Sequence, residues 1–367
     1  ERAFNPLEEI IGLAEAAGAK VVDSDFQRRL KPDVRTAFGK GKVEELRILC
    51  SHHHANLLIV DHNLSPSQAR NLEEEVMVRV VDRTELILDI FSTRARTRES
   101  RWQVELAQMQ YLRTRLRRMW THLERTEGAI GARGPGETQL ESDRRMVDQR
   151  ISKLRSRIKK VERRSVRRTH ERARGVSASL VGYTNAGKST LLNRLTNAQV
   201  EEANRLFATL DTIMRKLYIS NNNHVILSDT VGFIKNLPTE LVISFKTTLD
   251  EINFSDYLLH IIDISNPEWE KQKITVESIL ATILEDKYDQ RKIIEIWNKS
   301  DLLNKEDLAY FRNIAKRKNN VVLFSSKFKS GKENLIKLIN NKLKKNKKFL
   351  FFDFTSPTYG KKIKTLL

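Results

Sequence analysis

The run from Gly182 to Ser189 has the residue types and spacing of a phosphate-binding loop between an apolar run and a helical pattern. Gly182 and Gly187 would let the backbone curl so that successive N–H groups face an anion at the positive end of the helix. We expect Lys188 to neutralise the β and γ phosphates and the Ser189 hydroxyl to bind Mg²⁺. The predicted nucleotide contacts in this loop are Gly182, Tyr183, Thr184, Asn185, Ala186, Gly187, Lys188 and Ser189.

Three further motifs follow in the order of a guanine-nucleotide site, each after an apolar run. In the first, the Asp229 carboxylate would hold Mg²⁺ through water and the Gly232 N–H would touch the γ-phosphate. In the second, Asp301 can accept two hydrogen bonds from guanine donors that adenine lacks, and the third would close over the guanine O6. The predicted contacts are Asp229, Thr230, Val231, Gly232, Asn298, Lys299, Ser300, Asp301, Ser325, Ser326 and Lys327.

A candidate switch segment lies between the phosphate loop and Asp229, and Thr209 is its candidate Mg²⁺ ligand when the γ-phosphate is present. Phe233 follows Gly232 where many GTPases place a water-orienting Gln, and a phenyl ring cannot polarise water. Catalysis by Lys188, Thr209 and Gly232 would therefore need help from elsewhere, and a K⁺ ion near the Asn185 side chain is one hypothesis. The predicted contacts of the switch segment are Phe207, Ala208, Thr209, Leu210 and Asp211.

The basic residues of the chain are concentrated in one stretch. Lys and Arg exceed Asp and Glu by 19 overall, and residues 94–175 carry a net charge of +14. Apolar residues recur there at spacings of three and four in two runs, which predicts two long helices paired as an antiparallel hairpin. Between them Glu127 to Glu137 holds four glycines and a proline, which predicts an exposed tip around Arg133. The first apolar seam is Trp102, Leu106, Met109, Leu112, Leu116, Met119 and Leu123, and the second is Val147, Ile151, Leu154, Ile158 and Val161.

The second helix of the hairpin carries cations that are almost unmixed with acids. A helix that only solvates a surface usually alternates Glu with Lys or Arg, so the pattern favours contact with nucleic acid over a solvated face. Because aromatic residues are scarce there, we expect contact with the phosphates of a structured RNA instead of stacking on a single strand. The predicted RNA contacts are Arg133, Arg144, Arg145, Lys153 and Arg157.

Residues 1–93 alternate helical and extended patterns, which predicts a small α/β domain with a parallel sheet. The run from Gly39 to Lys42 is interpreted as a turn and the start of a helix, with a phosphate-binding loop as the less favoured alternative. The expected helices are 6–17, 42–54 and one starting at Ser65-Pro66, and the expected strands are 19–23, 57–61 and 77–81. The segment 84–92 is expected to lead into the hairpin.

The expected fold class is α/β. The chain is predicted to contain an N-terminal α/β domain at 1–93, a basic antiparallel helical hairpin at 94–175 and a P-loop GTPase domain with a doubly wound sheet at 176–345. A short C-terminal segment at 346–367 follows, and its Phe-rich run is expected to pack on the GTPase domain as a strand. The lone Cys50 cannot form an internal disulfide, and no apolar run approaches the ~20 residues needed to span a bilayer. These features favour a cytoplasmic protein without a membrane partner.

The motifs resemble those of a known family, the HflX GTPases. Residues 128–145 are similar to that family's hairpin signature, 181–190 to its phosphate loop and 206–211 to its first switch. The resemblance implies binding to the large ribosomal subunit and GTP-dependent separation of stalled ribosomes, often under heat stress, with the N-terminal region reaching toward the peptidyl-transferase region. It also implies a hydrophobic residue at Phe233. Thr212 and Ser326 depart from the family pattern, which more often has Pro and Ala there.

Three hypotheses follow for the whole chain. The first is a monomeric, partly ribosome-associated GTPase that uses GTP and Mg²⁺, is stimulated by the ribosome and splits or recycles stalled ribosomes through contacts with ribosomal RNA. The second is a passive factor for large-subunit assembly or anti-association that has no splitting activity. The third is an ATP-driven RNA-remodelling activity of the N-terminal domain, suggested by the turn at Gly39, although the sequence shows no matching Walker-B residue there.

Overall fold

The computed structural model describes residues 6–126, 135–172, 176–196, 206–207, 209–220, 223–238, 241, 251–285, 288–328 and 330–344. The chain divides into two compact units. The first unit comprises Glu1–Arg164, Ala203–Asp211 and Asn236–Thr247, and the second comprises Ser165–Glu202, Thr212–Lys235 and Thr248–Leu367.

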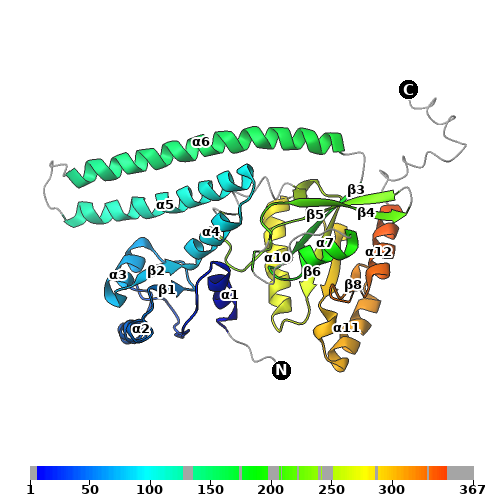
Figure 1. Cartoon of the computed structure of the whole chain (residues 1–367), viewed down its shortest axis with the longest axis horizontal. Helices are drawn as coiled ribbons and strands as arrows, with labels where there is room; N and C mark the ends of the chain where they lie inside the picture. The colour runs from blue at the N-terminus through cyan, green and yellow to red at the C-terminus, as the bar shows by residue number, and fades with distance from the viewer. Residues whose placement is uncertain are drawn as a thin grey trace, which may run out of the picture. The chain divides into compact units, whose positions relative to one another are not determined.

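The N-terminal part of the first unit packs helices around a two-stranded parallel sheet, as the alternating pattern predicted (Figure 1). Strand β1 pairs with β2 in the register Leu57↔Arg79, and buried residues such as Leu72 and Val80 fill the core between sheet and helices. Ser65 begins its helix with a capping box followed by proline, a combination that satisfies the first free backbone N–H groups. The elements are α1 Glu8–Ala16, α2 Lys40–His52, β1 Leu57–Val60, α3 Pro66–Val76, β2 Arg79–Asp82 and α4 Arg83–Arg94.

Two strand predictions in this region need correction. The strand expected at 19–23 is absent: the segment has no regular secondary structure, Val22 is 49% exposed, and the sheet contains only β1 and β2. The strand expected at 77–81 starts two residues later, since Met77 adopts a left-handed conformation that ends α3. The interpretation of Gly39 as the start of a helix is confirmed, because Gly39 is the N-cap of α2.

The predicted hairpin consists of α5 Arg98–Thr126 and α6 Pro135–Arg172, which run alongside each other in Figure 1. Leu106 on α5 packs with Val147, Ile151, Leu154 and Ile158 on α6, so the two seams meet as predicted. Ion pairs bridge the helices beside the seam, between Arg113 and Asp148 at 2.8 Å and between Arg150 and Glu105 at 2.5 Å.

Two details of the hairpin prediction are wrong. Leu112 is 41% exposed and lies outside the seam, because two successive spacings of three from Leu106 through Met109 turn it off the stripe that the alternation of four and three defines. The tip is shorter than Glu127 to Glu137, because Pro135 begins α6, where a missing N–H costs no helical hydrogen bond. Arg133, at the centre of the expected tip, lies outside the described residues, as does the C-terminal segment 346–367.

The second unit contains a six-stranded sheet in the order β4-β5-β3-β6-β7-β8, in which β4 is antiparallel to β5 and the other strands are parallel. The central strands are buried along nearly their whole length because helices cover both faces. The strands are β3 Val176–Gly182, β4 Ile213–Ser220, β5 Asn223–Asp229, β6 Tyr257–Asp263, β7 Ile293–Asn298 and β8 Val321–Leu323.

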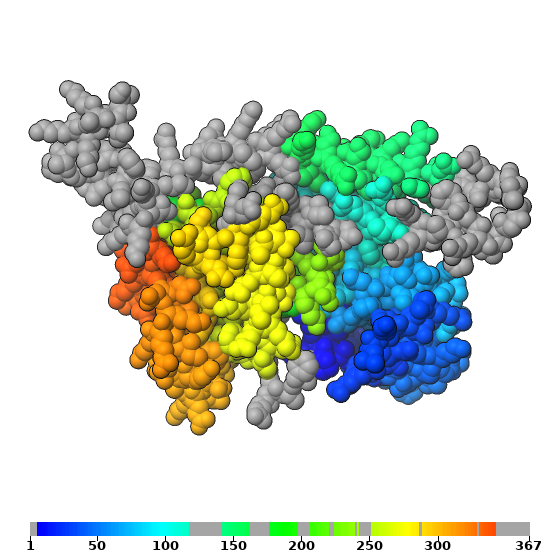
Figure 2. Space-filling model, turned by 180° about the vertical axis from the view of Figure 1, so that it is seen from behind, coloured from blue at the N-terminus to red at the C-terminus, as the bar shows by residue number. Residues whose placement is uncertain are grey.

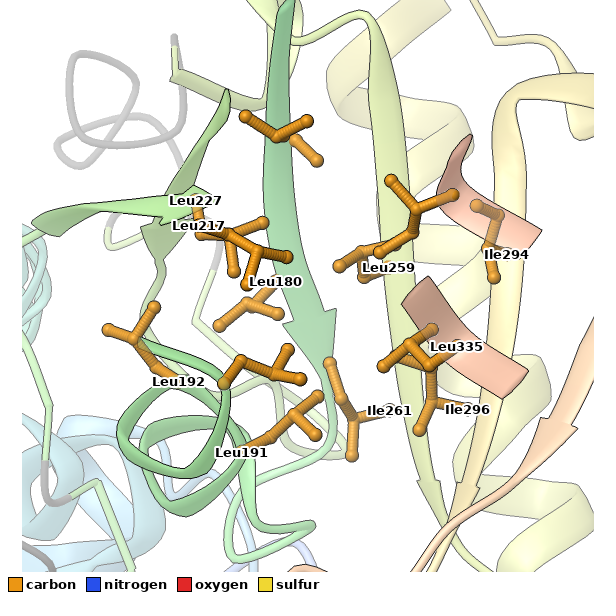
Figure 3. Close-up of a cluster of buried hydrophobic side chains, with 14 of the residues drawn as sticks. Leu180, Leu191, Leu192, Leu217, Leu227, Leu259, Ile261, Ile294, Ile296 and Leu335 are labelled. Atoms are coloured by element: carbon orange, nitrogen blue, oxygen red, sulfur yellow. The ribbon is translucent and has the colours of Figure 1, made fainter. Parts of the chain in front are cut away.

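Helices α7 Lys188–Thr196 and α12 Lys332–Lys344 cover one face of this sheet, and α10 Trp269–Leu284 and α11 Lys305–Arg317 cover the other. Figure 3 shows Leu191 and Leu192 of α7 pointing toward Leu180 and Ile261 on the strands. The carboxyl ends of the parallel strands are thereby held at one edge, where loops can converge on a ligand. Among the described residues, no helix combines the length and apolar character needed to cross a membrane.

Candidate functional site: a nucleotide pocket and a basic hairpin

The phosphate loop connects the end of β3 to the start of α7 in a backbone conformation that its residues dictate. Gly187 has φ +95°, and a Cβ atom there would lie 2.4 Å from Nδ2 of Asn298. A Cβ at Gly182 would lie 2.3 Å from the carbonyl oxygen of Ile261. Asn185 is left-handed at φ 59°, a conformation that Asn tolerates better than most residues. Both glycines are therefore required by close contacts.

Lys188 lies inside the curl of this loop and is almost completely buried. Its Nζ donates to the carbonyl oxygens of Tyr183 at 2.9 Å and Gly182 at 3.3 Å. Burial lowers the pKa of Lys188 from 10.5 to about 8, against the opposing effect of the Asp229 carboxylate. A bound phosphate would supply the negative charge that this buried ammonium lacks.

Ser189 and Asp229 meet beside Lys188, since one starts α7 and the other ends β5. The Ser189 hydroxyl donates to Oδ2 of Asp229 at 2.6 Å. Within the described part of the chain, no group of three or more His, Cys, Asp or Glu side chains could hold a metal ion by itself. A hydroxyl and a carboxylate fit Mg²⁺ bound with nucleotide, because that ion keeps several waters and takes its remaining oxygen ligands from phosphates.

The segment after Asp229 pairs with the phosphate loop through its backbone. The Phe233 N–H donates to the Gly182 carbonyl at 3.1 Å, and the Thr184 N–H donates to the Phe233 carbonyl at 2.7 Å. Gly232 allows this approach, since a Cβ there would lie 2.8 Å from Cα of Thr184. The Phe233 ring is buried, so this position supplies no polar group for water activation.

The predicted guanine loops converge on Asn298. Its Nδ2 donates to the Ala186 carbonyl at 2.8 Å, and its Oδ1 accepts from the Ser326 N–H at 3.1 Å and the Ser326 hydroxyl at 3.0 Å. Asn298 thus fastens the phosphate loop to the loop that follows β8. Asp301 accepts from the Ser325 hydroxyl at 2.5 Å, which orients a half-buried carboxylate.

Two side chains that brace these loops were missed by the sequence analysis. Asp263 pairs with Nζ of Lys299 at 2.7 Å, and Nε of Arg194 donates to the Ser326 carbonyl at 3.0 Å. Asp263 could have been found, because it ends an apolar strand in the same way as Asp229 does. No local pattern indicates Arg194, which is brought to its partner by packing across 132 residues. Lys327 is exposed, with its Nζ 5.3 Å from the centre of the Phe328 ring.

The predicted switch segment clusters with the first unit, whereas the phosphate loop and Asp229 belong to the second. Phe207 is buried against Phe91 of α4, and the Asp211 carboxylate accepts hydrogen bonds at the start of α5. The role of Thr209 as a Mg²⁺ ligand stays a prediction, and Ala208 lies outside the described residues.

The outer face of α6 presents cations to solvent. In Figure 2, α6 forms a green ridge along the cyan α5. Arg157 lies over the Trp102 ring at 5.6 Å, and Arg145 is exposed while Arg144 is half-buried. A further set of exposed cations forms no ion pair among the described residues, and we call it the hairpin patch: Lys153, Arg155, Lys159 and Lys160.

The sheet of the second unit, with these loops at the carboxyl ends of its parallel strands, defines a P-loop GTPase. Residues 5–92 match the family described as GTP-binding GTPase N-terminal, 94–174 its middle region, and 177–299 the 50S ribosome-binding GTPases.

Individual relatives resemble the chain over most of its length. The GTPase HflX of Magnetococcus marinus is 45% identical over 300 residues, covering 81% of this chain and 69% of that protein. The GTPase HflX of Escherichia coli is 42% identical over 325 residues, covering 88% and 76%. Among solved structures, the complex of SsGBP with GDP is similar at 25% identity and a TM-score of 0.50, covering 91% of this chain and 94% of that one. The chain therefore belongs to the HflX family of GTPases, enzymes that hydrolyse GTP.

Proposed function

We propose that the chain binds the large ribosomal subunit through its basic hairpin and uses GTP binding and hydrolysis to separate stalled ribosomes into subunits. The observation that carries this proposal is the hairpin patch, four exposed cations on one helix without acidic partners among the described residues. Exposed cations on a helix with no acids to neutralise them favour contact with a polyanion such as the phosphate backbone of RNA.

The pairing of charges within the hairpin supports this assignment. Arg113 and Arg150 lie beside the seam and pair with acids on the facing helix, so their charges serve the hairpin itself. The patch residues Lys153 and Lys160 lie elsewhere on α6 and are left to solvent. Because ribosomal RNA is a dense polyanion, contact with it would neutralise this uncompensated charge and release counterions.

The nucleotide is proposed to bind as GTP with Mg²⁺. Ser189 and, through water, Asp229 would hold the ion, with Thr209 as the ligand added in the GTP state, and the ion would neutralise charge on the β and γ phosphates. Lys188 would bind the same phosphates, and the Gly232 N–H would contact the γ-phosphate. Asp301 would select guanine.

Slow hydrolysis alone and faster hydrolysis on the ribosome are proposed because Phe233 offers no group to orient water. The ribosome, or a K⁺ ion near the exposed Asn185 side chain, would supply that help. Equal hydrolysis rates in K⁺ and Na⁺ would remove the proposed role of K⁺.

The test is GTP hydrolysis with and without purified large subunits. We compare the full chain with a variant in which residues 131–136 of the hairpin tip become a short neutral linker. Stimulation of about tenfold or more that is lost in the tip variant would support coupling between RNA and the GTPase. No stimulation of the full chain would contradict it, and the hairpin would then be tested against other RNAs.

A passive assembly or anti-association factor is the alternative. It would also bind large subunits, but intact ribosomes mixed with the chain and GTP would stay associated. Subunit profiles on sucrose gradients separate the two, with Lys188→Ala as the control that removes nucleotide binding. An excess of free subunits that depends on GTP and on Lys188 supports splitting.

A further inference from the structure

The candidate switch segment is hydrogen-bonded to the start of the first hairpin helix. Oδ2 of Asp211 accepts from the backbone N–H of Arg96 at 3.1 Å and of Thr97 at 3.3 Å. Oδ1 of the same carboxylate accepts from the Thr97 hydroxyl at 2.7 Å. These contacts join residues 114 and 115 positions apart and lie within the first unit.

Apolar contacts hold the same segment from its other end. The Phe207 ring packs edge-on against Phe91 of α4 with the ring centroids 4.7 Å apart, and both rings are buried. Leu206 lies so close to α1 that a Cβ atom on Gly12 would be 3.2 Å from its Cδ1. Both ends of the segment are thus fixed on helices of the first unit, with Thr209 between them.

The Thr97 side chain links Asp211 to the first turn of α5. Thr97 immediately precedes α5, and its hydroxyl oxygen accepts from the Ser100 N–H at 3.2 Å in the manner of an N-cap. The hydroxyl has one proton, and its 2.7 Å contact with Asp211 gives that proton a charged acceptor. The carboxylate also lies at the positive end of the α5 dipole, which adds to its preference for this position.

We propose that Thr97 is a positioning residue of the GTPase site, which acts on Thr209 by holding Asp211. Two residues of chain span at most ~7 Å, so Thr209 cannot move far while Asp211 stays bound to Thr97. In this proposal the contact persists with GDP, and engagement of Thr209 by GTP and Mg²⁺ breaks it. The start of α5 then reports the nucleotide state directly to the hairpin. This inference rests on the proposed role of Thr209 as the switch residue.

Linkage fixes the sign of the expected effect. A contact that persists with GDP and is lost with GTP opposes GTP binding and leaves GDP binding unchanged. Removing it by Thr97→Val should therefore tighten binding of a non-hydrolysable GTP analogue by roughly three- to tenfold relative to GDP. Thr97→Ser keeps the hydroxyl and should behave as the wild type.

A double-mutant cycle separates this effect from simple loss of a helix cap. Asp211→Asn weakens the same contact without touching the Thr97–Ser100 hydrogen bond, and it provides the test if Thr97→Val destabilises the chain. The two substitutions should be strongly non-additive in the ratio of GTP-analogue to GDP affinity. Fully additive effects, or a ratio unchanged by Thr97→Val, would overturn the proposal.

Amide hydrogen exchange of the full chain tests the structural step without ribosomes. The Arg96 and Thr97 amides should exchange faster with the GTP analogue than with GDP, and Thr209→Ala should abolish the difference. Equal exchange in the two nucleotide states would overturn the proposal, as would a difference that survives Thr209→Ala. Because no ribosome is present, failure of the ribosome-splitting proposal would leave these results intact, and failure here would leave the subunit profiles intact.

Discussion

The nucleotide pocket and the basic hairpin hold their charges in opposite ways. Lys188 is almost fully buried, and backbone carbonyls surround its ammonium group, whereas Lys153 on α6 is exposed without an ion-pair partner among the described residues. A buried charge depends on each neighbour, so one substitution should have a large effect. Exposed cations act through their summed charge, so single substitutions should have small effects that depend on salt. The four predictions below test this contrast in order of decreasing size.

Lys188→Ala should have the largest effect. It removes the buried ammonium that would pair with the β and γ phosphates, and GDP affinity should fall about a thousandfold, or ~4 kcal/mol. Fluorescent-GDP titration measures this. Lys305→Ala, an exposed lysine at the start of α11, is the control and should change nothing. If Lys188→Ala lowered GDP affinity by less than about tenfold, the buried lysine would behave like an exposed one, and the contrast would fail.

Asp301→Asn should shift the base preference of the site from guanine toward xanthine. An amide in place of the carboxylate keeps one uncharged acceptor and turns the other into a donor that faces a guanine N–H, so GDP affinity should fall about a hundredfold. The amide can donate to the C2 carbonyl of xanthine, so affinity for xanthosine diphosphate should rise. Asp307→Asn, on the exposed surface of α11, is the matched control. Unchanged base preference would remove Asp301 from the site.

His260 is a buried titratable side chain whose effect should appear in the stability of the fold. It is buried in β6, and desolvation, opposed by Glu295 and assisted by Lys273 and Lys188, lowers its pKa from 6.5 to about 4. Between these values the unfolded chain binds more protons than the folded chain. The free energy of unfolding should therefore decrease as the pH falls through this window, and it should be about 2 kcal/mol lower at pH 5 than at neutral pH.

Urea unfolding from pH 7 to pH 5 measures this dependence. His260→Leu should flatten it, and His224→Asn, at a half-buried position on β5, should leave it as in the wild type. A dependence that survives His260→Leu would assign the acid sensitivity to another group.

Neutralising the hairpin patch should have the smallest effect. Replacing Lys153, Arg155, Lys159 and Lys160 by Gln should weaken binding to large subunits about tenfold at physiological salt and reduce the salt slope by roughly three. Each single change should cost only a few-fold. The control replaces four exposed cations of α11, Lys305, Arg312, Lys316 and Arg317. Equal losses in the two quadruple variants would show nonspecific attraction.

The elements that the sequence predicted well are those with long, regular patterns. The heptad-like seams meet through Leu106 and Leu154, and the continuous apolar runs become the central strands of the second unit. The antiparallel strand β4, where exposed Arg215 and Tyr218 interrupt the apolar positions, was not anticipated. The strand expected at 19–23 failed for the opposite reason, because its apolar residues have no sheet to join.

The sequence by itself determined the phosphate loop. Its function depends on the φ angles and N–H groups of adjacent residues, so the spacing of Gly182, Gly187 and Lys188 is sufficient to predict it. Only the tertiary structure decided that Asn298 braces Ala186 across 112 residues and that Asp211 binds Thr97 across 114. Such contacts depend on packing between distant elements, which leaves no period or spacing in the chain. The structure therefore assigns the switch segment to the first unit, although its motif belongs to the GTPase domain.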